Sequence, residues 1–348
     1  MKQLTLFIVV TVLLISCTKD PDNQPGSFLT GNGVFIINEG NFMGGNGSLS
    51  FYSYDSLKIF NDLFISVNGR PLGDVPNSLA VSGELIYIVV NNSGKVEIAD
   101  INTLVSVKTI TGLKAPRNIS VINSTKAYVS SMYSDSLAII DLSDNSVSGY
   151  INLKRTSEAI AVIGNKAFVS NWIGGKEVMV INTDTDEVVD SIEVAMEPES
   201  MVIDKDKTLW VLCNGGWERE YNAELIGVNT STNKIEKRLI FPSKMSSPSC
   251  LQTDGSGSTL YYLETGVRKL RTDAASIPSA AYISESGHYF YKLGINPVNG
   301  DILVTDAVDY QQKGHLLIYK IDGTFESDVL ANIIPGMMYF NLNSDFTR

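Results

Sequence analysis

A repeat of about 40 residues constrains the fold of this chain more than any other feature. The aromatic residues Tyr87, Tyr128, Phe168 and Trp210 recur at spacings of 41, 40 and 42 residues. Each repeat holds four short segments of alternating apolar and polar residues, separated by turns rich in Gly, Asn, Asp and Ser, which is the pattern of β-strands. A period near 40 with four strands per unit is typical of a propeller blade rather than a solenoid coil. The repeat therefore predicts an all-β propeller with four-stranded antiparallel blades.

The number of units predicts seven blades. Four units are clear and two are looser in sequence: residues 76–110, 116–151, 157–192 and 198–239, then 249–284 and 289–330. We name the strands of a blade a to d, from the ring axis outward. The first unit has segments for strands b, c and d at 33–40, 47–55 and 57–66, but none for strand a.

Residues 337–342 have the strand a pattern, so we expect them to complete blade 1 beside residues 34–38. Closing the ring with the C-terminal segment leaves no open sheet edge. The alternative is a ring of six or eight blades, with the last two units misassigned.

The N-terminus predicts export. Residues 4–15 form an apolar run of twelve, whereas a membrane span needs about 20 residues. We therefore interpret residues 1–16 as a signal peptide. Residues 17–31 are rich in Pro, Gly and polar residues, which predicts a flexible tether before a single propeller at 32–348.

Two short motifs around Cys17 resemble those of bacterial lipoproteins. LISC at 14–17 resembles a lipobox, which implies that Cys17 is lipidated. CTKDPD at 17–22 is similar to the tag of surface-exported lipoproteins of Bacteroidetes, which implies an outer-membrane protein facing the cell exterior. The alternative is an ordinary signal peptide followed by a chance cysteine.

Charge and reactive residues narrow the function. The net charge of −11 opposes nucleic-acid binding, which requires clustered cations. Cys213 and Cys250 lie in apolar strands, so we expect free buried thiols rather than a disulfide. His288 and His315 fit no metal-ligand spacing, and we find no nucleophile elbow. We therefore expect a binding protein without metal or cofactor; a lyase or lactonase using His288 with Glu158 or Glu199 is the alternative.

The b–c and d–a loops are the predicted binding surface, because in a four-stranded meander they emerge at the same end of every blade. Residues 38–47 exceed the two to five residues that a hairpin needs. These loops carry amides, arginines and aromatic residues, which suit ligand binding. The predicted ligand-binding residues are Asn38, Asn41, Phe42, Asn92, Arg117, Tyr133, Arg155, Asn171, Trp172, Trp217, Tyr221 and Tyr310. The alternative for each aromatic is packing in the tunnel or between blades.

The repeats, such as VMVINTDTDEVVDSIEV at 178–194, resemble the YVTN-type, surface-layer-like seven-bladed propellers over residues 33–342. With the lipobox and the stretch NEGNFMGGNGSLSFY at 38–52, the chain resembles the BtuG-type vitamin B12 capture lipoproteins of Bacteroidetes. That resemblance implies that the loop-rich face binds a corrinoid (cobalamin) and passes it to a TonB-dependent outer-membrane transporter. A glycan or peptide ligand, with Trp172 and Trp217 stacking on sugar rings, is the alternative, as is a scaffold without a small ligand.

Overall fold

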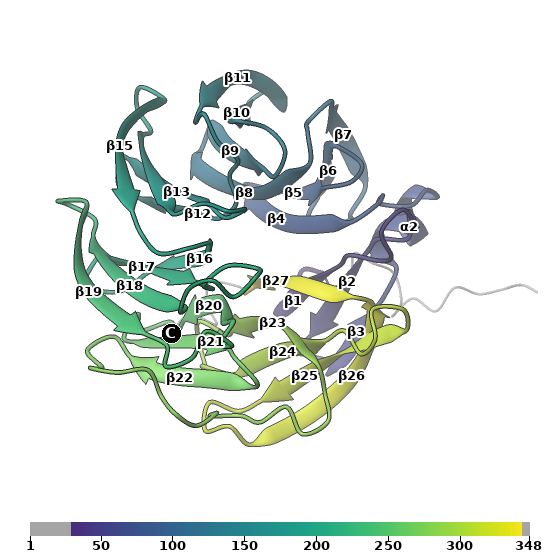
Figure 1. The fold of residues 1–348 in the computed structure, drawn as a ribbon. Coiled ribbons are helices and arrows are strands. Elements are labelled where there is room, and N and C mark those ends of the chain that lie inside the picture. Colours follow the sequence, from purple (N-terminus) through teal and green to yellow (C-terminus); the bar gives the residue numbers. More distant parts are fainter. Residues whose placement is uncertain (1–28, 343–348) are drawn as a thin grey trace, which may run out of the picture.

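The computed structural model describes residues 29–342, which form seven β-sheets arranged in a ring (Figure 1). Within each sheet the strands run antiparallel and follow one another from the ring axis outward. The predicted all-β class, the seven blades and the ring are therefore confirmed. The predicted signal peptide, the lipidation site Cys17 and tether residues 17–28 lie outside the described residues.

The strands of the blades have the following bounds, from the axis outward. Blade 1 contains β27 (Pro335–Asn341), β1 (Gly33–Asn38), β2 (Ser48–Ser53) and β3 (Lys58–Phe60). Blade 2 contains β4 (Pro76–Ser82), β5 (Leu85–Val90), β6 (Lys95–Asp100) and β7 (Ser106–Thr111). Blade 3 contains β8 (Pro116–Asn123), β9 (Lys126–Ser131), β10 (Ser136–Asp141) and β11 (Ser146–Asn152). Blade 4 contains β12 (Ile160–Ile163), β13 (Lys166–Asn171), β14 (Glu177–Asn182) and β15 (Glu187–Glu193).

The remaining blades follow the same order. Blade 5 contains β16 (Pro198–Ile203), β17 (Thr208–Cys213), β18 (Glu224–Asn229) and β19 (Lys234–Ile240). Blade 6 contains β20 (Ser249–Thr253), β21 (Thr259–Leu263) and β22 (Val267–Arg271). Blade 7 contains β23 (Phe290–Ile295), β24 (Ile302–Asp306), β25 (Lys313–Tyr319) and β26 (Phe325–Ile333).

Two outer edges differ from the regular pattern. In blade 6 the place of the fourth strand is held only by Ile283, which forms an isolated bridge to Val267. The preceding segment contains Pro278, which cannot donate to a strand ladder. In blade 1 the predicted strand over 57–66 is reduced to β3, because Asp62 is left-handed (φ 57°) and the helix α2 (Leu63–Asn68) follows.

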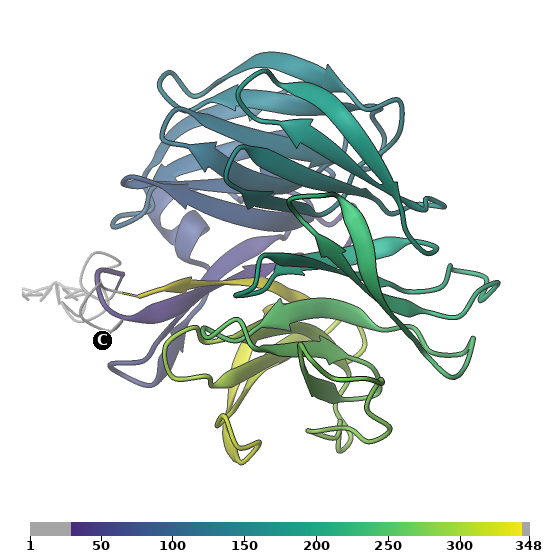
Figure 2. The same cartoon turned by 90° about the vertical axis from the view of Figure 1, so that its left-hand side faces the viewer.

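The C-terminal strand closes the ring as predicted. β27 pairs antiparallel with β1, with Val34 opposite Phe340 and Ile36 opposite Met338. Gly33 pairs with Asn341 at one end of this ladder, so both ends of the described chain lie together at the face opposite the b–c loops. Figure 2 shows the purple and yellow ends of the described chain at the same side of the ring.

The core lies between neighbouring blades rather than inside any one of them. One cluster joins Tyr87 and Ile98 of blade 2 to Ile119 and Ile140 of blade 3. Another joins Val34 of blade 1 to side chains of blade 7. This sharing explains why a single repeat cannot fold alone and why the ring has to close.

The repeating aromatics also connect the blades through polar contacts. Tyr87 donates to Asn145 Oδ1 in the next blade at 2.6 Å, and Tyr128 donates to Asp186 in the blade after that. Asp186 thus lies in the turn between β14 and β15 and also connects blades 3 and 4. Cys213 and Cys250 are free and buried as predicted, and burial raises the pKa of both thiols.

No helix within residues 29–342 has the length and apolar character needed to cross a bilayer.

Candidate functional site

Exposed apolar side chains gather at the end of the ring that carries the b–c and d–a loops. Of the 21 exposed large hydrophobic residues in the described chain, ten lie in these loops: Phe42, Met43, Tyr133, Ile173, Trp217, Tyr221, Met245, Tyr289, Val308 and Tyr310. The turns at the opposite end contribute Leu57, Val105 and Ile321. A cluster of exposed apolar side chains often marks a surface that binds a ligand or a partner. We call this end the loop-rich face.

A groove of about 700 Å³ lies on the loop-rich face, between the loops of blades 1, 2 and 3. Its lining consists of Phe42, Asn91, Asn92, Ser93, Gly94, Gly112, Leu113, Lys114, Ala115, Arg117, Met132 and Tyr133. Phe42 and Tyr133 are 68% and 74% exposed, so both rings are open to a ligand. We call it the rim groove.

Hydrogen bonds hold the loops of the rim groove in place. Asp74 accepts from the Met43 backbone N–H at 3.1 Å and from Asn92 Nδ2 at 2.5 Å, which joins the loops of blades 1 and 2. Asn41 Nδ2 donates to the Tyr310 carbonyl at 2.9 Å, which joins blade 1 to blade 7. The long loop 39–47 is therefore fixed at both sides, and Phe42 is presented by a braced backbone.

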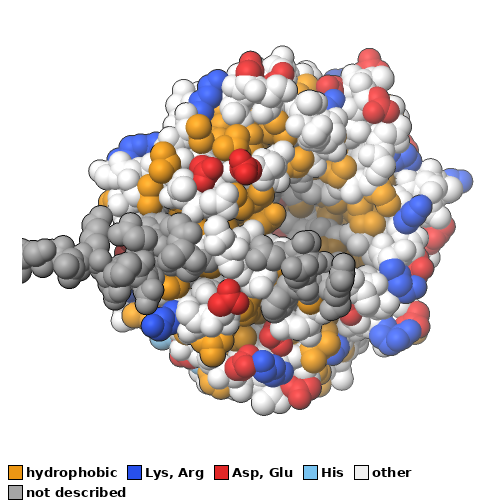
Figure 3. Space-filling model, turned by 180° about the vertical axis from the view of Figure 1, so that it is seen from behind, with side chains coloured by type: hydrophobic (Ala, Val, Ile, Leu, Met, Phe, Trp, Pro, Cys, Tyr) orange, Lys and Arg blue, Asp and Glu red, His pale blue; other side chains and the backbone are white. Residues whose placement is uncertain are grey.

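A second cavity, of about 450 Å³, lies on the ring axis and is lined by all seven inner strands. Its charged lining residues are Arg117, Glu158, Glu199 and Lys292, which come from the first residues of their strands or the links before them and so lie towards the loop-rich face. Seen from the opposite end, the molecule is hollowed near the axis, with hydrophobic side chains around the hollow (Figure 3). We call this space the axial cavity.

Arg117 lines both the rim groove and the axial cavity. Its guanidinium donates from Nε to Glu158 Oε2 at 2.9 Å and from Nη2 to Glu158 Oε1 at 2.8 Å, a bidentate pair. Burial opposes the charge, but Glu158 outweighs burial and raises the pKa of Arg117. The guanidinium carbon also lies 5.9 Å from the centre of the Trp172 ring.

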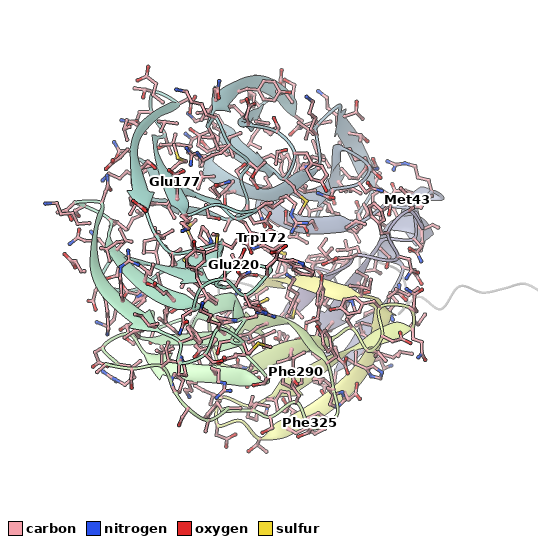
Figure 4. All side chains as sticks on the ribbon, viewed as in Figure 1. Met43, Trp172, Glu177, Glu220, Phe290 and Phe325 are labelled. Carbon is pink, nitrogen blue, oxygen red and sulfur yellow. The ribbon has the colours of Figure 1, made fainter. Side chains whose placement is uncertain are left out.

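Trp172 lies near the ring axis, as Figure 4 shows. The ring nitrogen is buried and has no hydrogen-bond acceptor among residues 29–342. An unmet buried donor is costly and marks a place where a ligand or a bound water can supply the acceptor.

The structure divides the twelve predicted site residues into groups. Phe42, Asn92, Arg117 and Tyr133 line the rim groove, and Asn41 braces its loop. Trp217, 89% exposed, and Tyr221 project from the blade 5 loop, where Lys176 Nζ lies 4.1 Å from the Tyr221 ring centre. Tyr310 packs edge-on against Tyr289 and Tyr291.

Three predicted residues have structural partners instead of an open position. Asn38 is fully buried and donates to Ser50 Oγ at 2.8 Å, and Asn171 is buried and donates to the Thr156 carbonyl at 2.9 Å. Arg155 forms an ion pair with Glu177. All three side chains thus hold neighbouring segments of the loop-rich face together.

The structure adds five residues to the predicted site: Asp74, Lys114, Glu39, Tyr291 and Lys292. Glu199, which the sequence suggested only for the lyase alternative, lines the axial cavity. Tyr291 donates to Glu39 Oε1 at 2.9 Å, and burial together with Glu39 raises the pKa of Tyr291, so the phenol stays protonated. The sequence does contain one sign of a charged axial cavity. Arg117, Glu158 and Glu199 occupy equivalent positions in three consecutive repeats.

The histidine expected for an enzyme is paired elsewhere. His288 Nδ1 lies 2.7 Å from Asp306 Oδ2, and Glu158 is taken by Arg117. His288 thus pairs with neither Glu158 nor Glu199 as the lyase alternative required. No group of three or more His, Cys, Asp or Glu side chains suited to a metal ion occurs within residues 29–342.

Together these features define a seven-bladed β-propeller with one loop-rich face, a rim groove and a charged axial cavity. The chain belongs to the family described as "Domain of unknown function (DUF5074)", which matches residues 32–332. A comparison with curated proteins finds none that matches.

Solved structures share the fold at low identity. A quinonprotein alcohol dehydrogenase-like protein from Bacteroides thetaiotaomicron is 15% identical, with a TM-score of 0.69 over 90% of this chain and 78% of that chain. A functionally unknown protein from Desulfotomaculum acetoxidans is 12% identical, with a TM-score of 0.66 over 89% and 99%. Virginiamycin B lyase from Staphylococcus aureus is 13% identical, with a TM-score of 0.57 over 72% and 83%. Such identities carry the fold alone.

Proposed function

We propose that this protein binds a corrinoid, vitamin B12, on its loop-rich face and, as a lipid-anchored outer-membrane protein, delivers it to a TonB-dependent transporter. The observation that carries the proposal is the rim groove, in which two exposed aromatic rings, Phe42 and Tyr133, stand beside the amides Asn91 and Asn92. A corrinoid is a broad ring edged with amides. Aromatic rings cover its faces, and asparagine side chains pair with its amides.

The energetics require several loops to act together. Nanomolar binding needs about −12 kcal/mol, while association itself costs roughly 4–15 kcal/mol. One aromatic side chain contributes at most about 4–6 kcal/mol by burial of about 150–250 Å² at about 25 cal/mol/Å². The loop-rich face offers Phe42, Tyr133, Trp217 and Tyr221 from three different blades, so a wide, flat ligand can engage several of them together.

The position of the chain ends supports capture from outside the cell. Residue 29, where the described chain begins, is held at the face opposite the loop-rich face, because Asn341 Nδ2 donates to the Leu29 carbonyl at 3.1 Å. A lipid anchor at Cys17 would therefore join the propeller at the face opposite the loop-rich face and leave the loops uncovered, as a capture protein needs.

The direct test is calorimetric titration of the chain from residue 18 onward, which retains every described residue, with cyanocobalamin. We expect one-to-one binding below micromolar concentration, accompanied by a change in the corrinoid absorbance spectrum. No heat and no spectral change at micromolar protein would refute the corrinoid proposal.

A second candidate is a glycan ligand at the blade 5 loop. Trp217 is 89% exposed, and an open indole stacks well on a sugar ring. Binding of an oligosaccharide that Trp217→Ala abolishes, together with no binding of cyanocobalamin, would favour this candidate over the corrinoid.

A further inference from the structure

Lys292 presents an ammonium group to the axial cavity without a direct partner. It lies on β23, the inner strand of blade 7, and lines the cavity. Within residues 29–342 its ammonium forms no ion pair and no hydrogen bond; its nearest recorded contact is the Tyr291 ring, whose centre is 5.1 Å from Nζ. Cys250 and the carboxylates of Glu199 and Glu39 outweigh burial, which opposes the charge, and raise the pKa of Lys292, so the ammonium is charged at neutral pH. A partly buried charge of this kind needs a polar partner in the cavity.

Glu199 supplies the opposite charge in the same cavity. Glu199 lines the axial cavity, and its carboxylate oxygen Oε2 accepts from the Cys250 backbone N–H at 3.0 Å. Glu199 and Lys292 influence each other electrostatically but form no ion pair. The cavity therefore offers a donor and an acceptor that are apart from each other, each able to bind a group placed between them.

This pair restricts the chemistry of an occupant. An anion would be attracted by Lys292 but repelled by Glu199, and Glu39 beside Tyr291 adds to the repulsion. A cation would meet Lys292 and the guanidinium of Arg117. An apolar group would displace water from both charges and leave them unsatisfied. A neutral group with a carbonyl acceptor and an N–H donor satisfies both residues.

We propose that the axial cavity receives a primary carboxamide side chain of the bound corrinoid, with the Lys292 ammonium donating to the amide oxygen and the Glu199 carboxylate accepting from the amide nitrogen. This inference rests on the proposed function. Arg117 relates the two spaces, because it lines both the axial cavity and the rim groove. A ring in the rim groove that contacts Arg117 would have one edge at a residue of the axial cavity.

The test compares cyanocobalamin with its monocarboxylic acid derivatives, in each of which one carboxamide is replaced by a carboxylate. With the unaltered protein we expect one isomer to bind at least about 10-fold more weakly than cyanocobalamin, because its carboxylate faces Glu199. In Glu199→Gln the neutral amide removes that repulsion, so the same isomer regains its affinity relative to cyanocobalamin. Glutamine keeps an acceptor for the Cys250 N–H, so the fold has no reason to change.

Lys292→Met gives the complementary measurement. We expect cyanocobalamin to bind about 10- to 100-fold more weakly, the effect of losing a hydrogen bond to a charged group. Lys234→Met is the matched control, because Lys234 is an exposed lysine at the start of β19, at the opposite end of the ring. This variant should bind cyanocobalamin with the same affinity as the unaltered protein. If Lys292→Met does not fold, the isomer comparison on the unaltered protein still decides the matter.

The outcomes separate this inference from the function on which it rests. No binding of cyanocobalamin to the unaltered protein overturns both. Corrinoid binding with equal affinity for all monocarboxylic isomers, and no loss in Lys292→Met, overturns the carboxamide assignment and leaves the function standing. Binding of glycine that Lys292→Met abolishes would assign the cavity to a zwitterion and also overturn it.

Discussion

Tyr133→Ala tests whether the rim groove binds the ligand. An aromatic side chain has about 150–250 Å² of surface, and Tyr133 exposes 74% of it. Roughly 110–185 Å² is thus free to be covered. A flat ligand that covers one ring face removes about half of that area, which at about 25 cal/mol/Å² amounts to about 1.4–2.3 kcal/mol. We expect the affinity for cyanocobalamin to fall about 10- to 40-fold.

The same arithmetic limits the loss of stability. The buried quarter of the Tyr133 side chain contributes at most about 1–1.6 kcal/mol to folding, which corresponds to a few degrees in Tm for a domain of this size. Tyr150→Ala is the control, since Tyr150 is a 60% exposed tyrosine on the outermost strand β11 of the same blade and is not among the residues that line the rim groove. Calorimetric titration and thermal unfolding of both variants decide the question. Unchanged affinity in Tyr133→Ala, or an equal loss in Tyr150→Ala, would refute the rim groove as the site.

Three further predictions concern stability. Arg117→Met leaves Glu158 buried without its cation, and we expect a loss of about 3 kcal/mol in the free energy of unfolding by urea; adding Glu158→Gln should recover most of it, and no recovery would contradict the pairing. Glu97 is buried, and although burial raises its pKa, the ion pairs and hydrogen bonds around it lower the pKa overall. Glu97 therefore stabilises the fold above its unfolded-state pKa of about 4.3, and this stabilisation is lost as pH falls through the lower folded-state pKa. In Glu97→Gln the urea midpoint should fall less steeply with pH below about pH 5. An unchanged pH dependence of the midpoint would show that Glu97 is not responsible. Met338→Asp places an unpaired charge in the strand that closes the ring and should cost about 3–5 kcal/mol, and a Tm within two or three degrees of the unaltered protein would contradict closure by β27.

The repeat made the ring predictable because its physical cause is local. In blades 2 to 5 a buried aromatic on strand b recurs at a nearly constant spacing, and a tight turn between strands c and d follows it in each blade. The closure by β27 followed for the same reason, since residues 337–342 show the inner-strand pattern and blade 1 lacks one. The outer edges of blades 1 and 6 were less predictable, because an outermost strand contacts one neighbour and its pattern is weak.

The inward positions of two predicted site residues have one cause. Asn38 and Asn171 are each the last residue of a strand b, where the alternation of side chains decides between the blade interior and the loop. The sequence pattern places both amides next to loops, and the backbone turns both inward, where they hold the loop by hydrogen bonds. Period-two alternation cannot locate the residue at which a strand ends, so it does not show whether an amide at a strand end lies inside the blade or in the loop.

Lys292 and the contact between Glu39 and Tyr291 could not be predicted as parts of the site for a different reason, and that reason indicates where function varies in this fold. Glu39 and Tyr291 are 252 residues apart, and only ring closure brings them together. The core between blades is built from the residues that repeat. The four charged residues that line the axial cavity belong to none of its clusters. Arg117, Glu158, Glu199 and Lys292 are therefore free to differ from blade to blade, and their differences create the donor and acceptor pattern of the axial cavity. In a closed ring of similar blades, positions that break the repeat while facing the axis are the ones to examine for ligand recognition.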